Sequence, residues 1–100
     1  MAHYLITYDN RPPRNYQALY GLMGSMGAVR LADSVWLVEL GGSAAALTMI
    51  VGRTLEPDDR LAVIQLMPGS DWRTQNVSAQ AVRWLSDHIA TADIFMLPQR

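Results

Sequence analysis

The chain contains no cysteine and no lysine among its 100 residues, and it has only two histidines. Without cysteine there is no disulfide, no thiolate nucleophile and no zinc site built on Cys ligands. Because lysine is absent, all eight permanent side-chain cations are arginines. The planar guanidinium of arginine binds carboxylate or phosphate through two hydrogen bonds at once, which the ammonium of lysine does not. The formal net charge of -1 at pH 7 argues against strong nonspecific DNA binding, which usually depends on an excess of positive charge.

The sequence also lacks a long hydrophobic run. No apolar stretch reaches the ~18 residues of a transmembrane helix, and no basic-then-apolar leader opens the chain. We therefore expect a soluble, cytoplasmic protein with no membrane partner. Hydrophobic residues make up 50% of the chain and charged residues 17%, a composition typical of one globular domain. Six Met and three Trp in so small a chain favour an apolar homo-oligomer interface.

The clearest strand pattern is the apolar run from Tyr4 to Tyr8, which leads directly into Asp9. Strand-favouring residues dominate this run, and the Pro12-Pro13 pair that follows cannot continue a ladder. A run this apolar indicates a central strand that is covered on at least one face. Asp9 is then expected at the exit of that strand, where side chains leave the core and meet solvent.

The rest of the first two-thirds of the chain predicts a β-α-β-β-α-β order. The expected elements are a helix over 16–26 capped by Asn15 and stopped by Gly27, strands over 28–31 and 34–40 in a bent or bulged hairpin, a helix from a Ser43 cap to about residue 54, and a strand over 60–67. This order belongs to the α+β class and fits a ferredoxin-like sandwich, a four-stranded antiparallel sheet with two helices on one face. We expect the first and last strands to lie together in the middle of the sheet.

Residues 1–70 thus form the predicted core, and residues 71–100 form a C-terminal extension of the same single domain. The extension carries a helix over about 77–90 and a short apolar run over 94–97, which favours an edge strand. One side of this helix is apolar and includes Val77, Ala81, Trp84, Leu85 and His88, so it is the candidate cover for the open face of the sheet. That sheet is either the chain's own or a partner's.

Asp9 is the sharpest candidate for chemistry. A carboxylate at a strand exit suits Mg²⁺ or Mn²⁺, because hard cations prefer oxygen ligands. One carboxylate is a poor cage, whereas two copies brought together across a dimer axis are a better one. The alternative is an Asx-turn that caps the loop before Pro12. Arg11 and Arg14 either clamp phosphate beside this position or belong to a solvated loop.

Other polar residues carry weaker patterns. Ser34 opens the third strand and either positions a water or phosphate oxygen or serves as the turn residue of the hairpin. Arg30 lies on the second strand, where Asp33 and Glu39 are its expected ion-pair partners. The two histidines, His3 and His88, are far apart in sequence and have no metal-ligand spacing, and Asp58-Asp59 does not match a calcium loop.

Three segments resemble one known family. They read Tyr-Leu-Ile-Thr-Tyr-Asp, then Asn-Tyr-x-x-Leu-Tyr-x-x-Met, then Gly-Ala-x-Arg-Leu-x-Asp-Ser-Val-Trp-Leu-Val. Over roughly residues 3–67 the chain looks like the CRISPR-associated protein 2 superfamily, with the stand-alone SinR-like branch nearest and the VapD toxins more distant. The third segment is the most specific part of the resemblance.

The resemblance implies a ferredoxin-like homodimer that binds RNA or DNA. It places Asp9 as the metal ligand, paired with its copy in the partner, Arg11 and Arg14 in a basic loop, and Ser34 at the opening of the third strand. Members are described as metal-dependent nucleases or as noncatalytic bridges for DNA. The chain departs from the family in its sparse Arg-Pro-Pro-Arg loop, its lack of lysine and its C-terminal helix, where the family usually has an exchanged strand.

Two hypotheses follow from these observations. The first is a homodimer that binds nucleic acid, with Mg²⁺-dependent phosphodiesterase chemistry at paired Asp9 residues supported by Ser34, and with Arg11, Arg14 and Arg30 as phosphate-binding groups. The second is a noncatalytic dimeric interaction module of the same fold. An enzyme acting on a small ligand in the cleft of such a fold has no positive support in the sequence.

Overall fold

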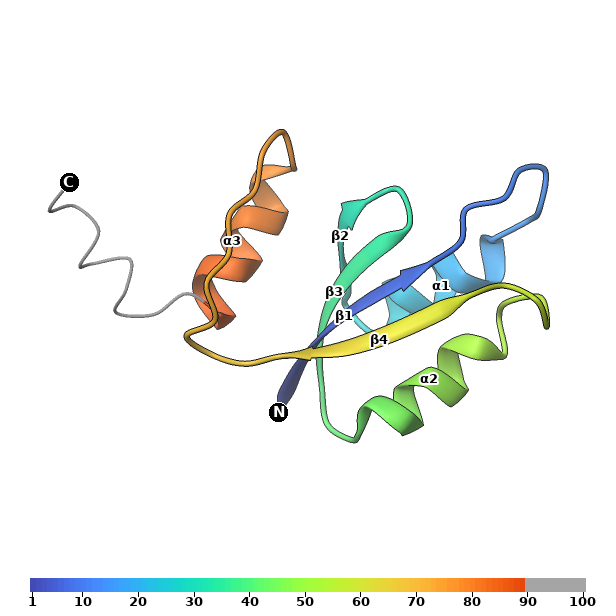
Figure 1. Ribbon diagram of the computed structural model, residues 1–100, viewed down its shortest axis with the longest axis horizontal. Coiled ribbons are helices and arrows are strands. Elements are labelled where there is room, and N and C mark those ends of the chain that lie inside the picture. Colours follow the sequence, from blue (N-terminus) through green and yellow to red (C-terminus); the bar gives the residue numbers. More distant parts are fainter. Residues whose placement is uncertain (90–100) are drawn as a thin grey trace, which may run out of the picture.

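Strand β1 (Ala2–Tyr8) runs through the interior of a four-stranded antiparallel sheet in the computed structural model, which describes residues 1–89 (Figure 1). The other elements are α1 (Gln17–Ser25), β2 (Val29–Ala32), β3 (Val35–Leu40), α2 (Ala44–Gly52), β4 (Leu61–Leu66) and α3 (Ala79–His88). The β-α-β-β-α-β order and the additional C-terminal helix predicted from the sequence are therefore confirmed. The chain is a small α+β protein.

The strand order is β2-β3-β1-β4, and every neighbouring pair is antiparallel. The prediction that the first and fourth strands share the middle is wrong for β4, which lies at an edge beside β1. The two helical connections each pass over one intervening strand, so β3 and β1 take the centre. The register shift between Arg30 and Ala32 confirms the predicted irregularity of the β2–β3 hairpin.

Local sequence signals set the ends of the helices. The hydroxyl of Ser43 accepts a hydrogen bond from the backbone N–H of Ala46 at 3.1 Å, which begins α2. The cap of α1 differs from expectation, since Tyr16 holds the cap position while the Asn15 side chain accepts from the Gln17 N–H at 2.8 Å. Gly27 follows α1 with φ of 70°, a left-handed conformation that glycine adopts without steric cost.

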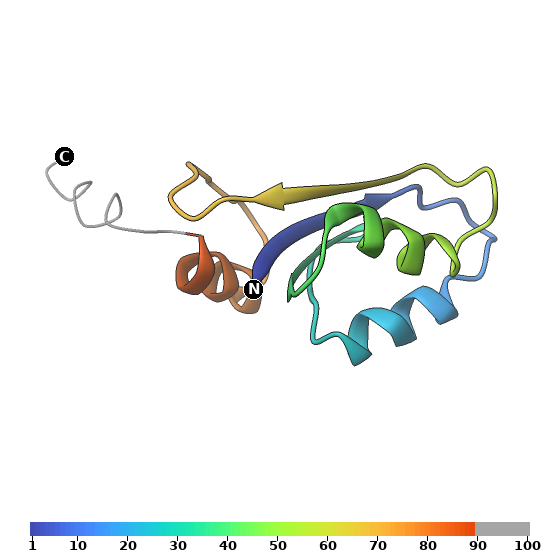
Figure 2. The same cartoon turned by 90° about the horizontal axis from the view of Figure 1, so that it is seen from below.

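One face of the sheet packs against α1 and α2, and Figure 2 shows both helices on the same side. The alternation of each strand sends every second side chain to this face. The buried residues of this core are Tyr4, Ile6, Tyr8 and Val38 from the sheet, Tyr16, Leu19 and Met23 from α1 and the residue before it, and Leu47 and Val51 from α2. Ile6, Leu19, Met23, Val38 and Val51 are all fully buried.

Helix α3 covers part of the opposite face, at the end of the sheet away from the β1–α1 loop (Figure 1). The hydroxyl of Ser78 accepts from the Ala81 N–H at 3.1 Å and caps the helix, one of the two caps expected. A second core forms there, with Val29 and Leu37 from the sheet and Ala81, Trp84, Leu85 and Ile89 from the C-terminal segment. The helix is shorter at both ends than predicted, and the predicted edge strand over 94–97 lies outside the described residues.

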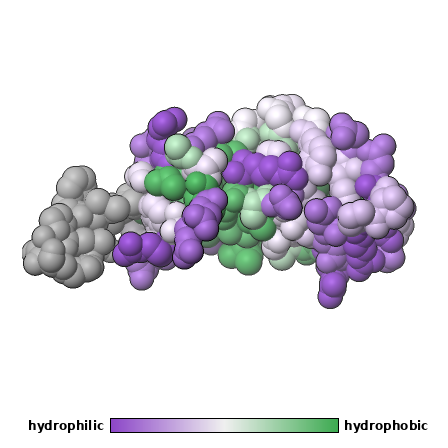
Figure 3. All heavy atoms as spheres, turned by 90° about the horizontal axis from the view of Figure 1, so that it is seen from above, coloured by the Kyte–Doolittle hydropathy of each residue, from purple (hydrophilic) through white to green (hydrophobic). Residues whose placement is uncertain are grey.

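The remainder of that second face is not covered within residues 1–89. On β4, Ile64 is 53% exposed, and its cross-strand neighbour on β1, Leu5, is only partly buried. Hydrophobic residues gather over the middle of the molecule in Figure 3, between more hydrophilic ends. The apolar residues of β4 thus divide between the two faces: Leu61 and Val63 pack against the first core, Leu66 packs against the second, and Ile64 lies on the open strip. In the part of the chain described, no helix has the length and apolarity needed to cross a membrane.

Candidate functional site

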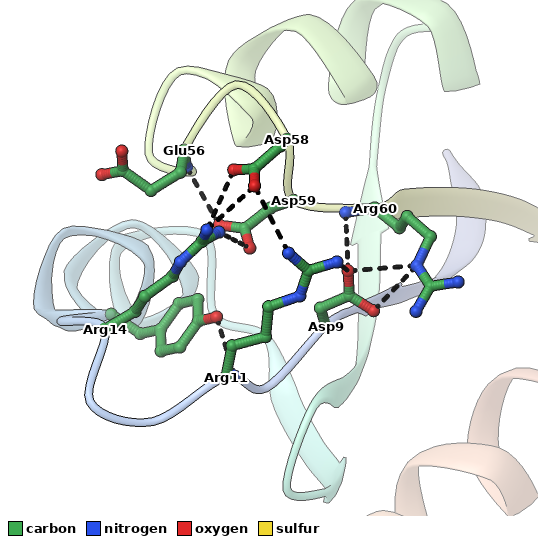
Figure 4. Close-up of polar contacts among 8 residues, drawn as sticks. Asp9, Arg11, Arg14, Glu56, Asp58, Asp59 and Arg60 are labelled. Atoms are coloured by element: carbon green, nitrogen blue, oxygen red, sulfur yellow. Dashed lines mark hydrogen bonds and ion pairs between the residues drawn. The ribbon is translucent and has the colours of Figure 1, made fainter.

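Asp9 follows β1 directly, as predicted, and arginines surround its carboxylate (Figure 4). One carboxylate oxygen, Oδ2, accepts the backbone N–H of Arg60 at 2.9 Å, and Nε of Arg60 lies 3.2 Å from both oxygens. Nη2 of Arg11 lies 2.9 Å from Oδ2. The Asp9 side chain is 17% exposed. The carboxylate therefore joins the loop after β1 to the start of β4, and this bond across the sheet replaces the Asx-turn considered from the sequence.

The bonds to Asp9 all favour its ionised form. The backbone N–H of Arg60, followed by its side chain, lowers the pKa of the Asp9 carboxyl below its usual value, and the Arg11 charge acts in the same direction. Asp9 is consequently an anion at neutral pH. Its acceptor positions are shared among two guanidinium groups and one amide.

Arg14 makes a second, adjacent set of ion pairs. Its guanidinium donates to Asp58 at 3.0 Å and also to Asp59, whose side chain is only 1% exposed. The hydrogen bond from Arg14 lowers the pKa of Asp58, and the same bond raises the pKa of Arg14 above its already high value. Asp59 also accepts the backbone N–H of Glu56 at 3.0 Å. Adjacent aspartates thus converge on one arginine instead of pointing apart.

Arg11 connects the two sets, because its Nη1 lies 3.5 Å from Asp58 while its Nη2 contacts Asp9. Its backbone N–H donates to the Tyr16 hydroxyl at 3.0 Å, which fixes the loop against α1. We call the six residues of this network the loop clamp; they are Asp9, Arg11, Arg14, Asp58, Asp59 and Arg60. Three carboxylates and three guanidiniums balance, so the loop clamp is neutral overall.

Of the predicted site residues, Ser34 lies near the loop clamp. The backbone carbonyl of Ser34 accepts the Tyr8 N–H at 3.2 Å, which places the turn before β3 beside the exit of β1. The contact is made by the backbone and fits the hairpin-turn interpretation. A shallow pocket adjoins the same exit, lined by Thr7, Tyr8, Asp9, Arg60, Leu61 and Ala62.

Arg30 lies elsewhere, on the edge strand β2. Its guanidinium stacks over the rings of Tyr20 and Trp36, with centroid distances of 4.9 Å and 5.2 Å. It also donates to the carbonyl oxygens of Ala32, at 3.3 Å, and Asp33. The expected pairing with Asp33 therefore uses the backbone oxygen. Arg30 is held by aromatic stacking and does not join the loop clamp.

The donor set around Asp9 does not fit Mg²⁺ or Mn²⁺ within one chain. Such ions require several oxygen ligands, and an adjacent positive charge opposes a second cation. Here one carboxylate faces two guanidinium groups. The guanidinium groups of the loop clamp can instead exchange a carboxylate for a phosphate, because guanidinium binds both anions through paired hydrogen bonds.

Among known proteins, no family model matches the chain and no solved structure is significantly similar to it.

The lowered pKa values predict acid sensitivity. The pKa of an Asp carboxyl in the unfolded chain is about 3.9. When folding lowers this pKa, the carboxylate stabilises the folded state at pH values above the unfolded-state pKa, and this stabilisation is lost as the pH falls through the folded-state pKa. Thermal unfolding of the wild type is therefore expected to shift to lower temperature below about pH 4, more steeply than for Asp9→Asn. Asp71→Asn, at an exposed position, is the control and should follow the wild type. Equal slopes for Asp9→Asn and wild type would contradict this role of Asp9.

Proposed function

We propose that the chain is a homodimeric, ferredoxin-like protein related to the CRISPR-associated protein 2 superfamily, and that it binds the phosphates of RNA or DNA through the arginines of the loop clamp. The observation that carries this proposal is the convergence of Arg11, Arg14 and Arg60 at the exit of β1. The resemblance assigns the metal ligand and the basic loop to this same place.

Two features of the fold support the family. A four-stranded antiparallel sheet with α1 and α2 on one face is consistent with a ferredoxin-like sandwich. The element order also matches the resemblance over its whole span of residues 3–67. Helix α3, by contrast, packs on the chain's own sheet, where the family usually has an exchanged strand.

Phosphate binding follows from the way the arginines are held. The side chain of Arg60 is 83% exposed and that of Arg11 is 38% exposed, so both are reachable from solvent. Exposed ion pairs contribute little stability, on the order of 0–1 kcal/mol. A nucleic-acid phosphate can therefore compete with Asp9 for these two guanidinium groups, while the backbone N–H of Arg60 stays on the Asp9 carboxylate. The aspartates then act as internal counterions that neutralise the arginines and hold their side chains in place when no nucleic acid is bound.

The open strip around Ile64 and Leu5 supports a dimer. Large apolar side chains exposed on a sheet face are commonly covered by a partner, and a second copy presents the same strip about a two-fold axis. The pocket beside Asp9 includes Thr7 and Ala62, cross-strand partners on β1 and β4 that also lie on the open face. Dimerisation over this strip would bring the two Asp9 positions to the edges of one interface.

Metal-dependent phosphodiester cleavage is the second candidate. It is favoured by one observation, the ionised carboxylate of Asp9 at the exit of β1. Because the donor set of one chain does not fit such an ion, its condition is that phosphate first draws the side chains of Arg11 and Arg60 away from that carboxylate, on which the Arg60 backbone N–H remains. The noncatalytic interaction module remains the alternative if this exchange does not lead to cleavage.

Nucleic-acid binding is tested by fluorescence anisotropy with a short labelled single-stranded RNA and a DNA duplex, over a series of salt concentrations. We expect affinity to fall with salt, and Arg60→Ala to weaken binding on all sequences and reduce the salt slope by about 1. Arg53→Ala, at an exposed position after α2, is the matched control and should bind like the wild type. The absence of salt-dependent binding to either probe would overturn the proposal.

The same samples, incubated with Mg²⁺ or Mn²⁺ and run on a denaturing gel, test the second candidate. Cleavage that is lost in Asp9→Asn and retained in Asp71→Asn would support it. Cleavage that persists in Asp9→Asn would show that the site is elsewhere. Binding without cleavage would leave the noncatalytic module as the function.

A further inference from the structure

The two histidines of the chain meet at the opposite end of β1 from Asp9. His3 is the second residue of β1, its cross-strand partner on β3 is Glu39, and His88 is the last residue of α3. Nε2 of His3 lies 3.2 Å from Oε2 of Glu39, and Nδ1 of His88 lies 3.8 Å from the same oxygen. One ligand atom from each residue falls within 4.8 Å of the other two.

These separations are close to those required for a shared metal ion. With Zn–N and Zn–O bonds of about 2.0–2.2 Å, two ligands of a tetrahedral zinc lie about 3.3–3.5 Å apart. His3 and Glu39 already lie near this spacing. His88 must move closer to both of them, because its Nδ1 lies 3.8 Å from Glu39 and the three ligand atoms lie within 4.8 Å of one another. Two imidazoles and one carboxylate form a ligand set known for catalytic zinc, in which water takes the fourth position.

The surroundings hold the rings in place. Trp84 lies against both imidazoles, with centroid distances of 5.6 Å to His3 and 4.8 Å to His88, and the two imidazole centroids are 4.9 Å apart. The side chains of His3, His88 and Glu39 are 13%, 29% and 38% exposed. The cluster is thus packed on its apolar side and open to solvent at Glu39, so an ion can enter.

We propose that His3, Glu39 and His88 bind one divalent transition-metal ion of the zinc class, and that this ion fastens α3 to β1 and β3. Imidazole ligands favour Zn²⁺, Ni²⁺ or Cu²⁺ over Mg²⁺ and Ca²⁺, so this site differs in chemistry and position from Asp9. The ion joins three elements that are distant in sequence. Figure 2 shows α3 beside the N-terminal end of β1, where the ion would sit.

The test uses the full chain without a histidine tag, stripped with EDTA and titrated with ZnCl₂ in a calorimeter. We expect one Zn²⁺ per chain and a rise in melting temperature, because a ligand that binds only the folded state stabilises it. Mg²⁺ should give neither effect. Co²⁺ in place of Zn²⁺ should give the visible absorption of a tetrahedral site.

Glu39→Gln and His88→Gln each remove one ligand while keeping the side chain similar in size. Each is expected to weaken Zn²⁺ binding by at least about 100-fold, more than the loss of an outer-shell partner usually does. Asp87→Asn, on the same helix, and Asp9→Asn, at the loop clamp, are the controls and should bind Zn²⁺ like the wild type. Failure of the wild type to bind Zn²⁺, or equal binding by all variants, would overturn the proposal and leave the nucleic-acid proposal untouched.

Discussion

Trp84→Ala is expected to lower the free energy of unfolding by about 3–5 kcal/mol, the usual cost of removing a buried Trp. Trp84 is 8% exposed and is the largest side chain that α3 contributes to the second core, where it belongs to the same cluster as Leu37. It also supports the rings of His3 and His88. The loss would be a large fraction of the 5–15 kcal/mol typical of a small domain.

Urea unfolding followed by far-UV circular dichroism measures this loss, and amide hydrogen exchange locates it. We expect exchange protection in α3 to fall most, because Trp84 is the largest side chain that the helix places in the second core. Val82→Ala is the control on the same helix, since Val82 is 36% exposed and its loss should change stability by at most about 0.5 kcal/mol. A Trp84→Ala protein as stable as Val82→Ala would show that α3 is not docked on the sheet in solution.

If the protein is the dimer proposed above, Ile64→Asp is expected to convert it to a monomer while leaving the fold intact. A charge at the centre of an apolar interface is costly to desolvate, whereas the same charge on the exposed edge strand of a monomer is well tolerated. Light scattering should report twice the chain mass of 11.1 kDa for the wild type and 11.1 kDa for the variant. The nucleic-acid affinity of Ile64→Asp should also be lower than that of the wild type, because two loop clamps no longer act together in the monomer.

Ile50→Asp is the matched control, since Ile50 is 43% exposed but lies on α2, which covers the other face of the sheet. It should remain a dimer. A wild type that stays at 11.1 kDa across micromolar concentrations would contradict the dimer. A dimer unaffected by Ile64→Asp would place the interface on a different surface.

The order of elements was predictable because each signal is local. Tyr4 to Tyr8 reads as a strand, Ser43 and Ser78 cap helices, and Gly27 adopts the left-handed conformation that its position suggested. The position of β4 was not predictable in this way, because its apolar residues have two explanations, a central strand or an edge strand with a face for a partner. Sequence pattern alone does not separate the two.

The site was predicted in part. Asp9 lies at the exit of β1 as expected, but its partner Arg60 lies 51 residues further along the chain. The pairing of Arg14 with Asp58 and Asp59 also joins distant loops, and only the sheet register brings them together. The sequence signal for this pairing is complementary charge: the loop after β1 carries Arg11 and Arg14, and the loop before β4 carries Asp58 and Asp59.

The meeting of the two histidines was even less predictable from the sequence. His3 and His88 carry no spacing pattern, because one is on the first strand and the other ends the last helix. Their meeting depends on the antiparallel register that places His3 opposite Glu39 and on the docking of α3 against β2 and β3. Ligands brought together by tertiary packing leave no periodic trace in the sequence.

The place of β1 has a consequence for synthesis on the ribosome. β1 leaves the ribosome before the other strands of the sheet. Its two neighbours, β3 and β4, begin only at Val35 and Leu61. Until β4 has emerged, the growing chain presents an apolar strand with an unpaired edge, the kind of surface to which foreign strands and chaperones attach. Pairing across such long separations is slow. The exposure of this edge of β1 to aggregation should therefore be greatest in the nascent chain and end when the segment up to Leu66 pairs with it.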